Sequence, residues 1–127
     1  MPGAFRILLI EDEPVIRELV RSMLSDDQVT VECAATGTEG LKLARTQPWD
    51  LILLDVVLPQ LDGISICRLL KADASTKGIA LHMLTAKARK ADVDVALKAG
   101  ADGYIHKPFR GSELMELVQR LRAAPRP

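Results

Sequence analysis

Aromatic residues and cysteines are scarce in this 127-residue sequence: Phe, Trp and Tyr together make up 3% of it, and only 2 residues are cysteine. Cys33 and Cys67 form no C-x-x-C pair, and each lies within an apolar pattern. We therefore interpret both as reduced, small hydrophobic residues rather than as redox or metal-binding groups.

An excess of charge of either sign is also missing, because 17 Lys and Arg residues balance 17 Asp and Glu residues. Without an overall basic field, we expect the chain to contact neither nucleic acid nor an anionic membrane surface. Long hydrophobic runs are missing as well. The apolar stretch near the N-terminus is short and ends at Glu11, so it predicts neither a signal peptide nor a membrane span. These features predict a soluble, cytoplasmic protein.

Hydrophobic residues are nevertheless plentiful, at 48% of the sequence, and a chain of this length fits one compact domain. We expect residues 1–122 to form that domain and residues 123–127 to be a tail or the start of a linker. Only AAPRP follows the last helical pattern, so we expect no DNA-binding or catalytic output domain in this chain.

Short apolar runs bounded by turn residues predict strands at residues 6–10, 29–33, 51–55, 79–85 and 103–105. Hydrophobic residues at three- and four-residue intervals predict helices that include residues 15–24, 41–44, 64–70, 93–99 and 112–121. Ser112 is the expected N-cap of the last helix, and Gly100 the expected C-cap of the one before it.

This regular alternation of strand and helix, with strands that are aliphatic on both faces, predicts a parallel sheet covered by helices on each side. Five strands and five helices in a chain of this length are typical of the smaller doubly wound α/β arrangement, with strand order 2-1-3-4-5. We therefore predict a flavodoxin-like three-layer sandwich, in which ligands bind beyond the carboxyl ends of the strands.

Charged and polar residues stand where the predicted strands end. Glu11 and Asp12 follow the first strand, Asp55 ends the third, Thr85 ends the fourth, and Lys107 lies just past the fifth. In the order 2-1-3-4-5 the first and third strands are neighbours, so Asp12 and Asp55 should lie side by side. Because like charges oppose one another's ionisation, a raised pKa, the Lys107 ammonium or a hard cation must offset them. Oxygen ligands alone favour Mg²⁺.

A carboxylate beside a metal ion and an ammonium can attack a phosphoryl group in line and form an acyl phosphate. We hypothesise that Asp55 is this nucleophile, that Thr85 donates to a phosphoryl oxygen, and that Lys107 offsets the charge. Taken singly, Asp55 and Asp12 are also typical of turn and helix caps, and Thr85 of an ordinary strand. Their convergence on one edge favours the chemical role.

Four motifs, ILLIEDEP, DLILLDVVLPQLDG, MLTA and AGADGYIHKPF, span nearly the whole chain. In this order and spacing the sequence resembles the receiver domains of two-component response regulators, a family that includes single-domain chemotaxis regulators. The resemblance implies a signalling switch: Asp55 accepts a phosphoryl group from a histidine kinase or phosphotransfer domain. A partner protein or a second copy then reads the surface formed by the last two helices and last strand. Apart from self-phosphorylation and autodephosphorylation, no enzymatic turnover is implied.

The resemblance also assigns individual residues. It implies a magnesium site made by Glu11, Asp12, Asp55 and the backbone carbonyl of Val57. It implies that Thr85 and Lys107 contact the phosphoryl group and that Tyr104 is an aromatic side chain that rotates in response. The peptide bond between Lys107 and Pro108 would be cis, a form largely confined to bonds that precede proline.

Some positions depart from the commonest family pattern. Glu11 stands where an aspartate is frequent, and its longer side chain is expected to reach the metal through water. The resemblance implies that Val57 and Lys87 affect the approach of water to an acyl phosphate, so the dephosphorylation rate is left open. His82 lies inside a predicted strand and is interpreted as a partly buried polar residue, not a phosphorelay histidine. The basic segment 87–90 is expected to be solvated, with an acidic partner as the alternative.

Two other classes of protein are weighed against the switch. Phosphatases with a strand-end aspartate nucleophile commonly carry a second acid two residues later, where this chain has Val57. An interaction module without phosphorylation would have no physical reason to keep mutually repelling acids. The kinase, the target, the oligomeric state and whether the receiver stands alone are left open by the sequence.

Overall fold

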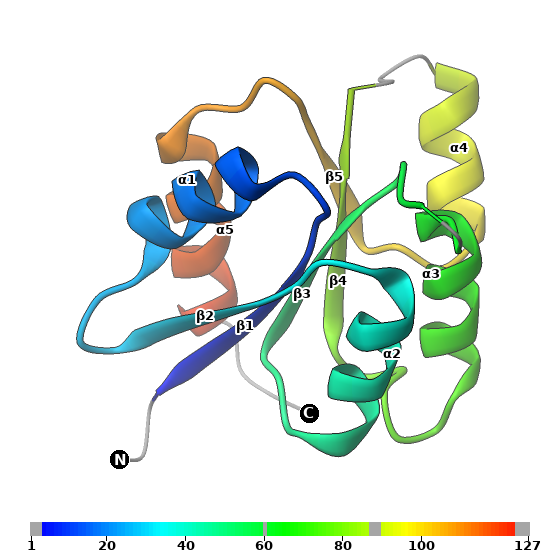
Figure 1. The fold of residues 1–127 in the computed structure, drawn as a ribbon, viewed down its shortest axis with the longest axis horizontal. Coiled ribbons are helices and arrows are strands. Elements are labelled where there is room, and N and C mark those ends of the chain that lie inside the picture. Colours follow the sequence, from blue (N-terminus) through cyan, green and yellow to red (C-terminus); the bar gives the residue numbers. More distant parts are fainter. Residues whose placement is uncertain (1–3, 60, 87–89, 124–127) are drawn as a thin grey trace.

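Five parallel strands form one central sheet (Figure 1) in a computed structural model that describes residues 4–59, 61–86 and 90–123. The strands are β1 (Phe5–Ile10), β2 (Val29–Ala34), β3 (Leu51–Asp55), β4 (Ala80–Thr85) and β5 (Gly103–His106). Their order is β2-β1-β3-β4-β5, and every pairing is parallel. The predicted sheet and its strand order are confirmed.

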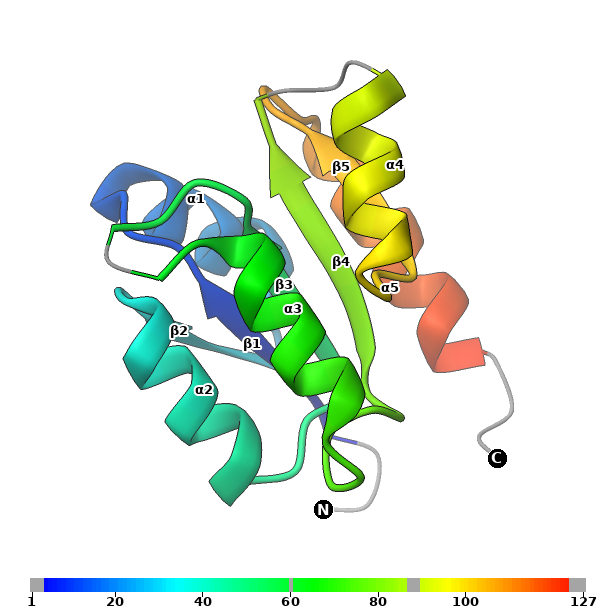
Figure 2. The ribbon, with the colours of Figure 1, turned by 90° about the vertical axis from the view of Figure 1, so that its right-hand side faces the viewer.

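Five helices cover the two faces of the sheet, as Figures 1 and 2 show. They are α1 (Pro14–Leu24), α2 (Gly37–Thr46), α3 (Gly63–Ala72), α4 (Lys90–Lys98) and α5 (Gly111–Ala123). Helices α1 and α5 pack on one face, and α2, α3 and α4 on the other. The three-layer α/β sandwich is therefore also confirmed. None of the described helices is long and apolar enough to cross a membrane.

Strand β3 shows how the sheet supplies both halves of the core. All of its residues are buried, and its four aliphatic residues alternate between the two hydrophobic clusters. Leu51 and Leu53 pack toward α1 and α5, while Ile52 and Leu54 pack toward α2, α3 and α4. Truncation of such a leucine to alanine costs about 2–5 kcal/mol in other proteins. Asp55, the last residue of β3, is thus carried on a strand that packs against helices on both faces.

The helix ends follow the sequence signals only in part. Gly100 ends α4 as predicted: its φ is 110°, its N–H donates to the Leu97 carbonyl at 3.0 Å, and the Ala101 N–H donates to the Ala96 carbonyl at 3.2 Å. Only glycine adopts this left-handed conformation freely, so the chain turns there toward β5.

The predicted N-cap Ser112 is wrong, and the alternative role of Asp12 as a helix cap is not found. Helix α5 begins at Gly111, so Ser112 lies inside its first turn, and the Arg110 N–H donates instead to Glu113 Oε1 at 3.0 Å. A glutamate at this position reaches back to the start of the helix whether or not a serine precedes it. The N-cap of α1 is Glu13 rather than Asp12, and within the described residues Glu13 makes no side-chain capping bond. Asp12 is therefore not used as a helix cap.

Both cysteines are free thiols, as the sequence predicted. Burial raises the pKa of the Cys33 thiol and of the Cys67 thiol, which leaves both less reactive than an ordinary cysteine. His82 is buried in β4 rather than partly exposed. The basic segment was expected to lie between β4 and α4, but Lys87 and Arg89 lie outside the described residues, as do residues 124–127.

Candidate functional site

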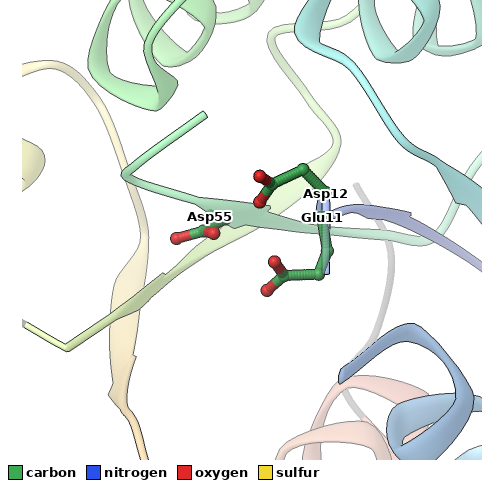
Figure 3. A group of neighbouring side chains, drawn as sticks. All are labelled: Glu11, Asp12 and Asp55. Atoms are coloured by element: carbon green, nitrogen blue, oxygen red, sulfur yellow. The ribbon is translucent and has the colours of Figure 1, made fainter. Parts of the chain in front are cut away.

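Three carboxylates meet at the carboxyl edge of the sheet, as Figure 3 shows. Glu11 and Asp12 follow β1, and Asp55 is the last residue of β3, the strand that pairs with β1. One oxygen from each carboxylate can be chosen so that all lie within 4.8 Å of one another. The sequence-based expectation that Asp12 and Asp55 lie side by side is confirmed.

The backbone around Asp55 holds its carboxylate in place. The Val57 N–H donates to Asp55 Oδ1 at 3.2 Å, so the capping role considered for Asp55 is also present. The Gly63 N–H donates to the Val56 carbonyl at 2.9 Å and folds the loop back on the strand. A Cβ at Gly63 would lie 2.1 Å from the Asp55 carbonyl oxygen, so this close approach requires glycine.

Lys107 supplies the positive charge at the site. Its Nζ lies 2.6 Å from Glu11 Oε1 and 3.3 Å from Asp55 Oδ2, and Glu11 is fully buried. The Lys107 N–H donates to the Thr85 carbonyl at 2.7 Å, which ties the end of β5 to the end of β4. The bond between Lys107 and Pro108 is cis, as the family resemblance implied.

The electrostatics of the cluster follow from burial and crowding. Burial, with a smaller contribution from the Asp55 charge, raises the pKa of Glu11 from 4.5 to about 7, against the hydrogen bonds from Lys107 and from the Glu13 N–H. Burial lowers the pKa of Lys107, but the hydrogen bond with Glu11 and the charges of Asp55 and Glu11 prevail and raise it. The raised pKa of Glu11 and the nearby Lys107 ammonium are two of the three ways in which the repulsion between the acids was expected to be offset.

The acidic cluster is also suited to the third way of offsetting the repulsion, which is the binding of a hard cation. All its side-chain donors are carboxylate oxygens, the ligand type that Mg²⁺ prefers. Asp12 is exposed, and among the described residues its carboxylate has no hydrogen-bond or ion-pair partner. An exposed carboxylate that caps nothing and faces two other acids is available to bind an ion.

Thr85 and Tyr104 border one cavity next to the site. Thr85 is buried at the end of β4, and the Tyr104 side chain on β5 is 44% exposed. A cavity of about 130 Å³ lies between them, lined also by Val56, Met83 and one side of α4. The Val57 side chain is 60% exposed in the loop after β3. Every described residue that the sequence proposed for the site therefore lies at or beside this edge of the sheet.

Two contacts at the site were not predicted from the sequence. One is the close pairing of Lys107 with Glu11, which is shorter than its contact with Asp55. The length of the Glu11 side chain was the available signal, because one extra methylene lets the carboxylate reach further. The other is a bond from the Arg17 guanidinium to the Glu11 backbone carbonyl, at 2.9 Å. No spacing rule marks an arginine for that role.

Comparison with known proteins agrees with this geometry. Residues 7–119 match the family model described as the response regulator receiver domain. The chain is 39% identical over 118 residues to the DNA-binding response regulator MtrA of Mycolicibacterium smegmatis, covering 92% of this chain and 50% of MtrA. It is 43% identical to the transcriptional regulatory protein CseB of Streptomyces coelicolor, covering 99% of this chain and 51% of CseB. The chain spans about half the length of the curated relatives it matches.

Solved structures give the same result. The receiver domain of the sensor histidine kinase PA1611 from Pseudomonas aeruginosa superposes with a TM-score of 0.87 at 35% identity, covering 95% of this chain and 99% of that one, and has a magnesium ion coordinated in its active-site cleft. A CheY-like receiver domain protein from Methanospirillum hungatei has a TM-score of 0.85 at 30% identity, covering 93% of each chain. With its sheet order, its edge cluster of acids and lysine, and these matches, the chain belongs to the receiver domains of two-component response regulators.

Proposed function

We propose that this receiver domain is a phosphorylation switch in which Asp55 accepts a phosphoryl group from a histidine kinase or a phosphotransfer protein. The observation that carries the proposal is the meeting of the Glu11, Asp12 and Asp55 carboxylates within 4.8 Å, with Lys107 Nζ 3.3 Å from Asp55. Mutually repelling acids beside a lysine are expensive to hold together unless they bind a cation and a phosphoryl group. Signalling, rather than turnover of an external substrate, is the activity proposed.

Mg²⁺ is the proposed cofactor, held by Glu11, Asp12, Asp55 and the backbone carbonyl of Val57. When bound, the ion supplies positive charge that stabilises the phosphoryl oxygens during transfer. The magnesium ion in the cleft of the PA1611 receiver domain supports this choice of metal. Within the chain, Asp12 supports it most directly, because its exposed carboxylate faces the other two acids and has no structural bond among the described residues.

Asp55 is the proposed nucleophile. A bond forms between an Asp55 oxygen and phosphorus as the bond from phosphorus to the donor histidine nitrogen breaks, and the released imidazole keeps the electron pair and takes up a proton. The Val57 N–H on Oδ1 and Lys107 near Oδ2 orient the carboxylate before the transfer. Lys107 then offsets the charge on the transferred group, which its flexible side chain allows.

The transferred group is proposed to act on the output face, the surface formed by α4, β5 and α5. It adds negative charge and strong hydrogen-bond acceptors next to Thr85, whose hydroxyl can donate to it. Thr85 and Tyr104 border the same cavity of about 130 Å³, so an inward move of Thr85 changes the space available to the Tyr104 ring. A partner protein or a second copy of the chain would bind the altered output face.

Several narrower proposals accompany this function. We propose a cytoplasmic location. We also propose residues 1–122 as the receiver domain and residues 123–127 as its tail or the start of a linker, although α5 itself extends to Ala123. We also propose that these residues contact no nucleic acid, because their charges balance. The names of MtrA and CseB describe DNA-binding or transcriptional proteins about twice as long as this chain, so those activities belong to the full relatives.

The deciding experiment is incubation with acetyl phosphate and Mg²⁺, followed by intact mass spectrometry. The wild-type chain should gain one phosphoryl group, and it should gain none after Asp55→Asn or in the presence of EDTA. Asp27→Asn is the matched control, because Asp27 is an exposed acid outside the cluster, and this variant should be labelled like wild type. Equal labelling of wild type and Asp55→Asn would remove Asp55 from the proposed role.

A further inference from the structure

Arg17 makes an unusual contact for a residue so close to the start of a helix. It lies within one turn of the α1 N-terminus, and its Nη1 donates to the Glu11 backbone carbonyl at 2.9 Å in a partly buried setting. A cation near a helix N-terminus opposes the helix dipole, so this placement does not serve helix stability. The contact instead joins α1 to the loop that carries two acids of the site.

The bond from Arg17 fixes the peptide unit that precedes Asp12. On its other side, the Glu11 N–H donates to the Ala34 carbonyl on β2 at 3.0 Å, so Glu11 is anchored to the sheet and to the helix. Because a peptide unit is planar, fixing the Glu11 carbonyl oxygen also fixes the N–H and the Cα of Asp12. The position of the Asp12 Cα, from which its side chain extends, is then set.

Asp12 needs such external support. Its carboxylate is exposed and has no hydrogen-bond or ion-pair partner among the described residues, whereas Glu11 and Asp55 are both held by Lys107. The orientation of Asp12 toward the other two acids thus depends on the backbone that carries it and on its own χ1 rotamer. The Arg17 guanidinium is the side chain that restrains that backbone at the Glu11 carbonyl.

We propose that Arg17 is a positioning residue of the magnesium site, which holds the peptide between Glu11 and Asp12 so that the Asp12 carboxylate faces Asp55. This inference rests on the proposed function, because it assumes that the acidic cluster binds Mg²⁺. Arg17 does not touch the ion or the phosphoryl group. It acts only through the backbone of its two neighbours in the loop.

The direction in which Mg²⁺ affinity changes when Arg17 is replaced distinguishes a positioning role from a purely electrostatic one. Loss of a positive charge near a cation site would by itself strengthen Mg²⁺ binding, because like charges repel. Loss of a positioning bond weakens it, and removal of groups that orient metal ligands lowers metal affinity about 10-fold or more in other sites. Arg17→Met removes the charge and the donor together, so the two explanations predict opposite results.

Calorimetric titration of Mg²⁺ into the full chain tests the proposal. Arg17→Met should bind Mg²⁺ about 10-fold more weakly than wild type. Arg21→Met is the matched control, because Arg21 lies one turn later on the same helix and pairs with the exposed Glu18 at 3.6 Å. This control should bind like wild type. Arg17→Gln, whose shorter side chain leaves the carbonyl unpaired, is the second variant if Arg17→Met does not fold.

Two further readouts exclude a purely structural role. In metal-free protein, the amide protons of Asp12 and Glu13 should exchange with solvent faster in Arg17→Met, while those of β3 stay as in wild type. At saturating Mg²⁺, acetyl phosphate should label Arg17→Met to the wild-type extent. Unchanged or tighter Mg²⁺ binding by the folded variants would overturn the role of Arg17. Absence of Mg²⁺ binding in wild type would instead overturn the proposed function on which it rests.

Discussion

The buried Glu11 carboxyl predicts that the metal-free protein loses stability as the pH rises through the weakly acidic range. Burial raises the pKa of this group from 4.5 to about 7 in the folded chain. Between these two values the folded state keeps a proton that the unfolded state has released. Raising the pH therefore favours unfolding, so the stability that is present below about 4.5 is lost as the pH rises through about 7.

The magnitude follows from the size of the pKa change. Each pKa unit corresponds to about 1.4 kcal/mol, so a rise from 4.5 to about 7 corresponds to an upper value of about 3 kcal/mol. The group is fully buried, so solvent screening does not reduce this value by much. Since small domains are stabilised by about 5–15 kcal/mol in total, a loss of this size is readily measured.

Urea denaturation in EDTA from pH 4.5 to pH 8 provides the assay. Trp49, the single tryptophan, reports global unfolding because it is buried in the core just before β3, at the opposite end of that strand from Asp55. Other groups titrate over this range, so the useful quantity is the difference in unfolding free energy between wild type and Glu11→Gln. Glutamine stays neutral at every pH and can still accept a bond from Lys107.

This difference should fall by about 3 kcal/mol, to the disadvantage of wild type, as the pH rises from 4.5 to 8. Glu13→Gln is the matched control, because Glu13 is an exposed acid two residues away and its variant should follow wild type. A difference between wild type and Glu11→Gln that stays constant with pH would refute the reasoning, since the Glu11 carboxyl would then titrate alike in both states.

The remaining predictions concern other parts of the fold. Gly63→Ala should lower the unfolding free energy in urea by about 2 kcal/mol or more and reduce labelling by acetyl phosphate, because its Cβ would meet the Asp55 carbonyl oxygen at 2.1 Å. Gly100→Ala should cost about 1–3 kcal/mol in the same assay, because φ there is 110°. Burial lowers the pKa of His82 from 6.5, so wild type should lose stability relative to His82→Gln as the pH falls below 6.5, the opposite direction to Glu11.

The fold and the location of the site could be predicted because they depend on patterns that the sequence repeats. Aliphatic runs that alternate with helical spacing specify a parallel sheet, and parallel strands bring their carboxyl ends to one edge. Glu11, Asp12 and Asp55 needed no further information to be placed together. Gly100 was predictable for a similar reason, because its position after a helical pattern is typical of a left-handed C-cap.

Side-chain pairings within the site could not be predicted in the same way. At the start of α5 the Arg110 N–H donates to the Glu113 side chain, although Ser112 was the predicted cap. Residue preferences for the N-cap position do not decide which of two neighbouring side chains makes such a bond. The bond from Arg17 to the Glu11 carbonyl joins residues six apart across a loop. It forms only at the orientation in which α1 packs against the sheet. Such contacts depend on exact backbone geometry rather than on periodicity.

The pairing of Lys107 with Glu11 gives a physical reason for the site to require a cation. Three ionised carboxylates against one ammonium leave an excess of negative charge in a partly buried cluster, and the raised pKa of Glu11 relieves it by retaining a proton. A divalent ion would cancel that excess and allow Glu11 to ionise, so ion binding and proton release are linked. Lys107 lies closer to Glu11 than to Asp55, so the negative charge of a phosphoryl group on Asp55 would have to draw the ammonium away from Glu11.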